Sequence, residues 1–373
     1  MKNKFHFILG ITFILYIMGF FVLQLFIKDK TFSELENRTL TTLPTLSRQA
    51  LLDGSFGEAF ETYIADQFPL RNQFISLKAN TERALLKKEN NGVFLGKDGY
   101  LLQDFKEPDL ELAKRNASYI SELANSFNVY VALAPTATSV LKDKLPNFAQ
   151  PYDETSFISL VYNSLSDKVH KVPLYETLSQ HKNEYIYYKT DHHWTTLGAY
   201  YSYVAFCENA NITPKSIDQF NINTVTDSFY GSLFSKGNFT FIKPDTLQIF
   251  SPKEPETLSV TYEATGVTTD TLYEPSYLET KDKYSVFLDN NHPLIKIKTS
   301  AKTGKKLLII KDSYANCFVP FLTSHYESIE ILDLRLLTIP VKTYALENQI
   351  DDVLLLYNVQ NFSSEGKLSL LKQ

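Results

Sequence analysis

Short apolar segments typical of β-strands alternate with longer segments typical of helices over most of this chain. The clearest strand segments are NVYVALAP at 128–135, KKLLIIK at 305–311 and DVLLLYN at 352–358. Helical periodicity occurs between them, as at about 155–167 and 196–209. Short strands are also expected near VPLYE (172–176) and EYIYY (184–188), and a hairpin at VFLGKDGYLL (93–102). Neighbouring parallel strands need a long connection, which is usually a helix. The alternation therefore predicts an α/β fold, in which helices cover both faces of a mostly parallel sheet.

One region departs from this alternation. Residues 229–300 contain short runs of alternating polar and apolar residues, such as TLQIFSP and LSVTYEA, bounded by Pro, Gly and Asn. Such runs are typical of short strands joined by turns. We therefore expect a β-rich insertion here. Its expected role is to shape a substrate groove, because added segments on a rigid scaffold often carry binding residues, and a role in stability is the alternative.

The chain begins with a long apolar segment. The 23 residues from Phe5 to Ile27 include no Asp, Glu, Lys or Arg, and a helix needs about 20 apolar residues to cross a bilayer. The segment ends with bulky residues where a signal peptidase needs small ones, which predicts a retained transmembrane helix. Two lysines flank it on each side, so the positive-inside rule does not decide the orientation.

The charge balance and the cysteines exclude several kinds of protein. The chain has 37 Lys and Arg against 42 Asp and Glu, a formal net charge of −5, and it has no long basic run. This pattern argues against nucleic-acid binding. Cys207 and Cys317 are neither in a CxxC pair nor beside a histidine, so they indicate no metal or redox site. We expect two buried free thiols, and a disulfide between them is the alternative.

The strand at 305–311 is followed by a candidate nucleophile. It ends abruptly at Asp312, and Ser313 opens a segment with helical patterning at about 314–323. A serine at such a junction exposes its Oγ, and its own N–H and the positive end of the helix can stabilise an oxyanion. Ser313 is therefore a candidate for acyl transfer. The alternative is that Asp312 or Ser313 only caps the helix.

A second polar group precedes the predicted helix at 196–209, and it consists of Asp191, His192, His193 and Trp194. In an extended segment, residues i and i+2 point to the same side, so Asp191 and His193 share a face and His192 points away. The carboxylate can then bind the Nδ1 proton of His193, which leaves Nε2 free to accept a proton from a serine. We interpret Asp191 and His193 as acid and base of a Ser-His-Asp triad. His192 is interpreted as structural, packed or hydrogen-bonded beside Trp194.

Two other interpretations of the Asp-His-His cluster remain open. An Asp beside two histidines could bind a metal ion, as in intracellular phosphoesterases with a DHH string, but those proteins need further Asp motifs that this chain lacks. The cluster could also lie on a loop without a catalytic role, although the strand-ending serine downstream argues against this. We therefore expect neither a metal ion nor another cofactor.

The string DHHW at Asp191–Trp194 resembles the motif of the DHHW family, which is similar to the SGNH-like alginate O-acetyltransferases. Other segments fall in the order expected of that family: FSELENRTL, DQFPLR (66–71), VFLGKDGYLL (93–102), FYGSLFSK (229–236) and KDSYAN (311–316). The resemblance implies a flavodoxin-like SGNH-hydrolase fold. It also implies that Asp191, His193 and Ser313 form the triad, and that the large domain lies outside the cytoplasm.

The resemblance is incomplete around the nucleophile. SGNH hydrolases have Gly-Asp-Ser at this point, whereas this chain has Lys311 in the first position. Those enzymes also take oxyanion donors from a separate Gly and Asn, and Gly231 and Asn358 are the candidates here. A turn glycine and an asparagine at the end of a strand are the alternative roles.

These features divide the chain into three parts: a membrane anchor at 1–27, a stalk and helical segment at 28–92, and a catalytic domain at 93–373. The resemblance implies an O-acyltransferase, with acetyl as the expected group, that acts on a cell-envelope or exopolysaccharide glycan. A multi-spanning membrane acyltransferase would supply the acyl group, as in the resembled systems.

Two alternative functions use the same sequence features. The first is an esterase that removes the same acyl groups, because a transferase and an esterase share the acyl-enzyme and differ only in the acceptor. The second is a non-catalytic glycan-binding or scaffold protein, in which the aromatic residues of the β-rich insertion stack on sugars.

Overall fold

The computed structural model describes residues 2–33, 38–254 and 256–373. The chain divides into two compact units. The first extends to Lys87 and includes Asn238–Thr240, and the second consists of Lys88–Gly237 and Phe241–Gln373.

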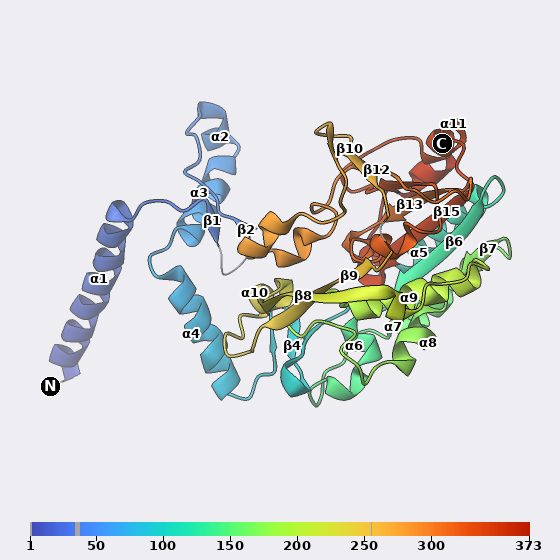
Figure 1. The fold of residues 1–373 in the computed structure, drawn as a ribbon. Coiled ribbons are helices and arrows are strands. Elements are labelled where there is room, and N and C mark those ends of the chain that lie inside the picture. The colour runs from blue at the N-terminus through green and yellow to red at the C-terminus, as the bar shows by residue number, and fades with distance from the viewer. Residues whose placement is uncertain (1, 34–37, 255) are drawn as a thin grey trace. The chain divides into compact units, whose positions relative to one another are not determined.

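The first unit is mostly helical. It contains α1 (Lys2–Phe26), β1 (Phe32–Ser33), β2 (Arg38–Thr39), α2 (Arg48–Leu52), α3 (Ser55–Asp66) and α4 (Arg71–Ala84) (Figure 1). Within α1, the stretch Lys4–Phe26 is long and apolar enough to cross a membrane, by length and composition. At the end of α3, the buried carboxylate of Asp66 accepts hydrogen bonds from the Arg38 guanidinium and the Thr41 N–H. The Arg38 contact keeps the pKa of Asp66 well below its usual range despite burial.

The second unit is built on an eight-stranded sheet with the strand order β11-β10-β12-β14-β13-β15-β6-β7. Five neighbouring strands run parallel: β14 (Ser328–Leu332), β13 (Lys306–Lys311), β15 (Asp352–Asn358), β6 (Asn128–Ala134) and β7 (Val169–Lys171). Three antiparallel strands extend the sheet: β12 (Leu294–Lys298), β10 (Ser259–Tyr262) and β11 (Val267–Thr269). The predicted mostly parallel α/β sheet is therefore confirmed.

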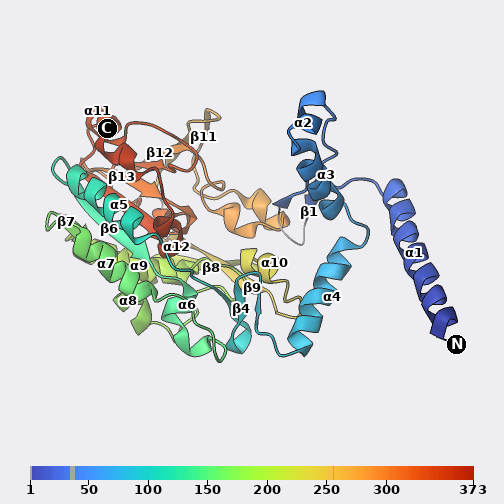
Figure 2. The same ribbon diagram turned by 180° about the vertical axis from the view of Figure 1, so that it is seen from behind.

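Helices cover both faces of this sheet (Figures 1 and 2). One hydrophobic core is formed with α5 (Leu110–Leu123), α7 (Glu154–Ser164), α11 (Val341–Glu347) and α12 (Val359–Ser363). The other is formed with α6 (Ala137–Val140), α8 (Leu174–Gln180) and α9 (Thr196–Asn209). Alternate residues of β13 enter the two cores, Leu308 and Ile310 on one side and Leu307 and Ile309 on the other. Burial on both faces explains why the central strands are almost continuously apolar.

The region predicted as a β-rich insertion does not form a single module. Strand β9 (Asp245–Pro252) pairs with β8 (Phe220–Phe229) in a two-stranded antiparallel ribbon, beside the short α10 (Ser232–Gly237). Strands β10, β11 and β12 instead join the central sheet. Between β11 and β12, a 3-10 turn at Lys283–Val286 carries a tyrosine that belongs to the site.

The hairpin predicted at 93–102 is present and consists of β4 (Val93–Leu95) and β5 (Leu101–Gln103). With β3 (Glu89–Asn90) it forms a small antiparallel sheet. Two other local predictions were wrong. The segment EYIYY contains only an isolated bridge, between Tyr187 and Trp194. The segment VPLYE (172–176) was predicted as a strand, but the strand β7 ends just before it and α8 begins within it, after Pro173.

The helix predicted after Ser313 is also absent, and two 3-10 turns, Ser313–Ala315 and Val319–Leu322, take its place. The side chain of Asp312 accepts the N–H of Tyr314 at 2.9 Å. Pro320 lacks an N–H and would fall in the interior of a helix that began at Ser313, which disfavours a regular α-helix.

Candidate active site

The site lies where the carboxyl ends of the central strands meet. The chain passes from β13 to β14 on one side of the sheet centre and from β6 to β7 on the other. In open α/β sheets, this reversal of direction creates a crevice at the carboxyl ends of the strands. Ser313 lies two residues after the end of β13, and Asn358 ends the neighbouring β15. The fold thus presents the candidate nucleophile at the edge where such sheets bind ligands.

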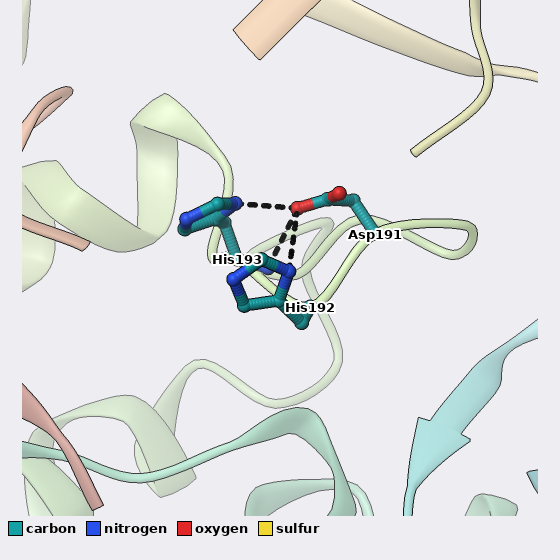
Figure 3. Close-up of side chains that lie close together, drawn as sticks. All are labelled: Asp191, His192 and His193. Atoms are coloured by element: carbon teal, nitrogen blue, oxygen red, sulfur yellow. Dashed lines mark hydrogen bonds and ion pairs between the residues drawn. The ribbon is translucent and has the colours of Figure 1, made fainter. Parts of the chain in front are cut away.

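The structure brings Ser313, His193 and Asp191 into one hydrogen-bonded chain. Nε2 of His193 lies 2.7 Å from Oγ of Ser313, and Nδ1 of His193 lies 2.5 Å from Oδ1 of Asp191. The same Asp191 oxygen accepts the backbone N–H of His193 at 2.9 Å (Figure 3). The carboxylate therefore fixes the ring, so that Nε2 faces the serine hydroxyl. This is the arrangement in which a histidine removes a proton from a serine.

Asp191 is held as a buried carboxylate. Burial alone would raise its pKa, but the neighbouring His193 and His192 and the hydrogen bonds to the carboxylate outweigh this effect. The N–H of Ser232 donates to Oδ2 at 2.7 Å. The pKa of Asp191 consequently lies well below its usual range, and the group is ionised at neutral pH.

A further aspartate fixes the backbone that leads into this motif. Asp245, the first residue of β9, is buried and accepts the N–H groups of Lys189 at 2.8 Å and Thr190 at 2.7 Å. It also accepts the Thr190 hydroxyl at 2.5 Å, and that hydroxyl accepts the N–H of Gly231 at 3.0 Å. Sequence reasoning missed Asp245, because no local pattern distinguishes it from any other aspartate at the start of a strand.

Tyr284 connects the candidate base to the candidate nucleophile. Its ring stacks on the His193 ring, with centroids 3.8 Å apart and planes inclined by 8°. Its hydroxyl donates to the carbonyl oxygen of Ser313 at 3.0 Å and lies 3.2 Å from Sγ of Cys317. Burial raises the pKa of Tyr284 far above its usual value, so the hydroxyl keeps its proton. No sequence signal marked this residue, because it lies in a separate segment with no motif of its own.

The two cysteines are buried free thiols, as predicted. Burial raises the pKa of both Cys207 and Cys317 to about 12, so neither is a thiolate at neutral pH. They are therefore unreactive under ordinary conditions.

Trp194 joins the histidine segment to the serine turn. Its indole is fully buried, and Nε1 donates to the carbonyl oxygen of Tyr314 at 3.0 Å. The hydroxyl of Tyr314 in turn donates to the carbonyl oxygen of His192. These two hydrogen bonds hold the segment that carries His193 against the turn that carries Ser313.

His192 is packed and hydrogen-bonded, as predicted, but it does not point away from Asp191 and His193. Its ring lies beside that of His193, with centroids 3.8 Å apart, and its Nδ1 is 2.6 Å from Oγ of Ser232. The prediction failed because the segment turns at this point and is not extended. Burial and the nearby His193 lower the pKa of His192 to about 4, so this ring is neutral at pH 7. Ligand atoms of Asp191, His192 and His193 lie within 4.8 Å of one another, a spacing that could also hold a metal ion.

A family model described as DHHW protein matches residues 115–332, more than half of the chain. The chain belongs to the DHHW family. A search of curated proteins gives no match.

Solved structures of similar fold include three informative examples. A DHHW family protein from Eubacterium siraeum is 28% identical, with a TM-score of 0.65, over 76% of this chain and 95% of that one. PatB1 of Bacillus cereus, solved with a sulfonyl adduct, is 21% identical with a TM-score of 0.63, over 75% and 98% of the two chains. The O-acetyltransferase domain of Pseudomonas putida AlgJ is 16% identical with a TM-score of 0.47, over 75% and 98%. The Eubacterium siraeum and Bacillus cereus structures share the fold of this chain.

The two oxyanion candidates already use their donors elsewhere. The N–H of Gly231 donates to Thr190, and a Cβ on Gly231 would come within 2.2 Å of Cβ of Asp191, so this glycine permits close approach to the acid. Asn358 donates its N–H to Oδ2 of Asp312 at 2.8 Å and its side-chain Nδ2 to the carbonyl oxygen of Ala134 at 3.3 Å. By contrast, the N–H of Ser313 donates to no other residue in the described part of the chain.

Lys311 occupies the position where SGNH hydrolases have glycine, and its side chain is fully buried. Its Nζ donates to Oδ1 of Asn291 at 2.8 Å and to Oδ1 of Asn316 at 2.6 Å, and Asp333 lies 3.9 Å away. Burial lowers the pKa of Lys311 to about 8, although Asp333 acts in the opposite direction. The lysine ties the serine turn to the segment that precedes β12, so its contacts are structural.

Proposed function

We propose that this chain is an O-acyltransferase, with acetyl as the group transferred, that works through an acyl-enzyme on Ser313. The continuous hydrogen-bonded chain from Ser313 through His193 to Asp191 is the observation that carries the proposal. The serine supplies the nucleophile, the imidazole moves the proton, and the buried carboxylate fixes the tautomer.

In the first half-reaction, Oγ of Ser313 attacks the carbonyl carbon of the acyl donor while its proton passes to Nε2 of His193. The bond to the leaving group breaks, and His193 returns the proton to that group. The Ser313 N–H, which has no acceptor among the described residues, would donate a hydrogen bond to the developing oxyanion. Asp191 stabilises the imidazolium while the proton is held.

In the second half-reaction, a hydroxyl of the acceptor gives its proton to His193 and attacks the acyl carbon. The bond to Oγ of Ser313 breaks, and the serine recovers the proton from His193. The acceptor leaves as an ester. If water is the acceptor, the same steps release the free acid, and the protein is an esterase.

The setting proposed for this reaction is the outer face of a cell membrane. Helix α1 would be a single-pass anchor, with the catalytic domain extracytoplasmic. The acceptor would be a cell-envelope or exopolysaccharide glycan, in keeping with the resemblance of the DHHW motifs to alginate O-acetyltransferases. A multi-spanning membrane acyltransferase would deliver acyl groups across the bilayer, and no cofactor is required by the triad.

An experiment with the full chain in detergent tests the proposal. The protein is incubated with an activated acetyl ester and defined oligosaccharides, and the products are separated by chromatography and mass spectrometry. Acetylated sugar supports the transferase, and free acetate in the presence of sugar supports the esterase. Absence of both, with retained sugar binding, would overturn an enzymatic role and favour a scaffold.

A further inference from the structure

His192 is the exposed member of the Asp-His-His cluster. Its side chain is 30% exposed, whereas those of His193 and Asp191 are 6% and 5% exposed. A substrate that reaches Ser313 must approach from solvent, so it meets His192 on the open side of the cluster. The mechanism above assigns no role to this side chain.

The His192 ring is fixed rather than loose. Its Nδ1 is hydrogen-bonded to Oγ of Ser232 at 2.6 Å, and Tyr314 donates to its carbonyl oxygen. Its remaining ring nitrogen, Nε2, forms no hydrogen bond with any residue in the described ranges. A ring held at one nitrogen and open at the other is preorganised to bind a ligand.

The open nitrogen faces the same way as the catalytic one. Figure 3 shows that the rings of His192 and His193 both direct Nε2 away from Asp191. The ring centroids are 3.8 Å apart, with planes inclined by 38°. Since Nε2 of His193 is the atom that must meet the acceptor hydroxyl, Nε2 of His192 lies beside the acceptor.

The hydrogen-bonding capacity of His192 narrows the chemistry of its ligand. Its Nδ1 is already hydrogen-bonded to Oγ of Ser232, so Nε2 is the nitrogen left for a ligand. A neutral imidazole nitrogen is a donor in one tautomer and an acceptor in the other. A hydroxyl group both donates and accepts, so it can pair with either tautomer, whereas a carboxylate pairs only with a donor and an ammonium only with an acceptor.

We propose that Nε2 of His192 binds a second hydroxyl on the carbon next to the one that is acylated, so that the site selects vicinal diols as acceptors. This inference rests on the proposed function and names its acceptor class. Staggered hydroxyls on neighbouring carbons lie roughly 3 Å apart, which suits two imidazole nitrogens on adjacent rings. A monohydric alcohol, water, or a diol with distant hydroxyls can pair with only one of them.

The test compares two acceptors that differ only in the spacing of their hydroxyls. The full chain in detergent is acetylated with an activated ester and offered cyclohexane-1,2-diol and cyclohexane-1,4-diol in equal amounts, with both stereoisomers of each. The ratio of the two monoacetates is the readout. It is independent of how much of each preparation is folded, because both acceptors compete for the same acetyl-enzyme.

We expect the wild type to favour the 1,2-diol by about tenfold, the worth of one additional hydrogen bond of about 1.4 kcal/mol. His192→Phe keeps a flat ring without nitrogens, and should bring the ratio to about one. His192→Gln restores an amide at a similar reach, and should give an intermediate ratio. A wild type without preference, or a His192→Phe variant that keeps it, overturns the inference.

Intact-mass spectrometry of the same wild-type sample separates this inference from the proposed function. If no acetyl group appears on Ser313, the proposed function fails and this inference fails with it. If the acetyl-enzyme forms but the product ratio does not depend on His192, the proposed function stands and only the diol selection is wrong.

Discussion

Tyr284 lies flat against His193, with ring centroids 3.8 Å apart and ring planes inclined by 8°, while its hydroxyl holds the Ser313 carbonyl oxygen. One side chain therefore touches both the candidate base and the candidate nucleophile. The ring of Tyr284 makes the aromatic contact and its hydroxyl makes the hydrogen bond. Substitutions can therefore separate the effects of the two contacts.

Tyr284→Phe removes only the hydroxyl, whereas Tyr284→Leu removes both contacts. We expect Tyr284→Phe to cost about 1 kcal/mol of stability and to lower acylation severalfold. Tyr284→Leu should lower acylation by about a hundredfold, since loss of positioning near the chemistry costs this much. The loss should appear in kcat for an activated acetyl ester and leave KM nearly unchanged. A purely structural role for Tyr284 would lower the melting temperature without this kinetic pattern.

Ser313→Ala should abolish the acetyl-enzyme. The substitution removes the nucleophilic oxygen and one hydrogen bond to His193, and the turn keeps its cap because Asp312, not Ser313, accepts the Tyr314 N–H. The expected stability loss is about 1 kcal/mol. Intact-mass spectrometry after exposure to an acetyl ester is the measurement, with Ser118→Ala on the exposed side of α5 as the control. Acetylation of Ser313→Ala at the wild-type level would identify a different nucleophile.

His193→Ala should lower acylation by about a thousandfold or more, the scale seen when a triad member is removed. Asp191→Asn should behave similarly, because the amide favours the wrong tautomer of the ring. His192→Ala should instead act mainly on acceptor use and stability. Stopped-flow measurement of acylation with a chromogenic acetyl ester compares the three variants.

A metal site predicts the opposite pattern for the same residues. Asp191, His192 and His193 could supply three ligands, so both histidines would then matter alike. Chelator would inactivate the protein, and added divalent metal would restore it. Chelator sensitivity together with equal losses at His192 and His193 would replace the triad by a metal centre.

Glu154 should make stability depend on pH. Its buried carboxylate accepts the N–H of Thr136 at 2.8 Å and the hydroxyl at 2.5 Å, and burial raises its pKa to about 7 from 4.5. The folded state then binds more protons than the unfolded state between these values. Stability from this group is present below pH 4.5 and falls as pH rises to about 7, by about 3 kcal/mol at most.

Glu154→Gln should remove this fall, so its stability relative to wild type should rise between pH 4.5 and pH 7.5 in urea unfolding. His192 provides the matched control with the opposite sign. Its pKa is lowered from 6.5 to about 4, so it stabilises the fold as pH rises through that interval, and His192→Gln should lose stability relative to wild type. Slopes of the same sign for the two variants would contradict one of the two assignments.

The topology prediction concerns α1. If the apolar helix stays in the membrane and the large domain lies outside, protease added to intact cells with a permeable wall should degrade the domain. An antibody tag placed at the N-terminus should then detect a fragment that contains α1. Full protection of the chain in such cells would place the domain in the cytoplasm.

Much of the central sheet could be predicted from sequence, because strands buried on both faces leave an unmistakable apolar pattern. The segments 128–135, 305–311 and 352–358 all correspond to strands. Their spatial order could not be predicted, since pairing between distant strands depends on packing and leaves no local pattern. The joining of β10–β12 to the same sheet was missed for this reason.

The candidate site could also be predicted only in part. The contact of Asp191 with His193 was predicted, although from an extended geometry that the segment does not have, and a serine after a strand was enough to suggest Ser313. The partners of these residues come from other segments, and contacts such as those of Asp245 and Tyr284 form only on folding. His192 was misplaced because period-two geometry holds only for extended backbone, and the chain turns there.

The position of β15 has a consequence for how the protein is made. This strand is the last of the chain, yet it lies between β13 and β6 and pairs with β6 from Asn128 to Ala134. During synthesis, more than half of the chain must therefore be made after β6 before its neighbour β15 is available for pairing. Removing β15 would leave β13 and β6 without the neighbour that they share, so a late stop codon should prevent the central sheet from forming.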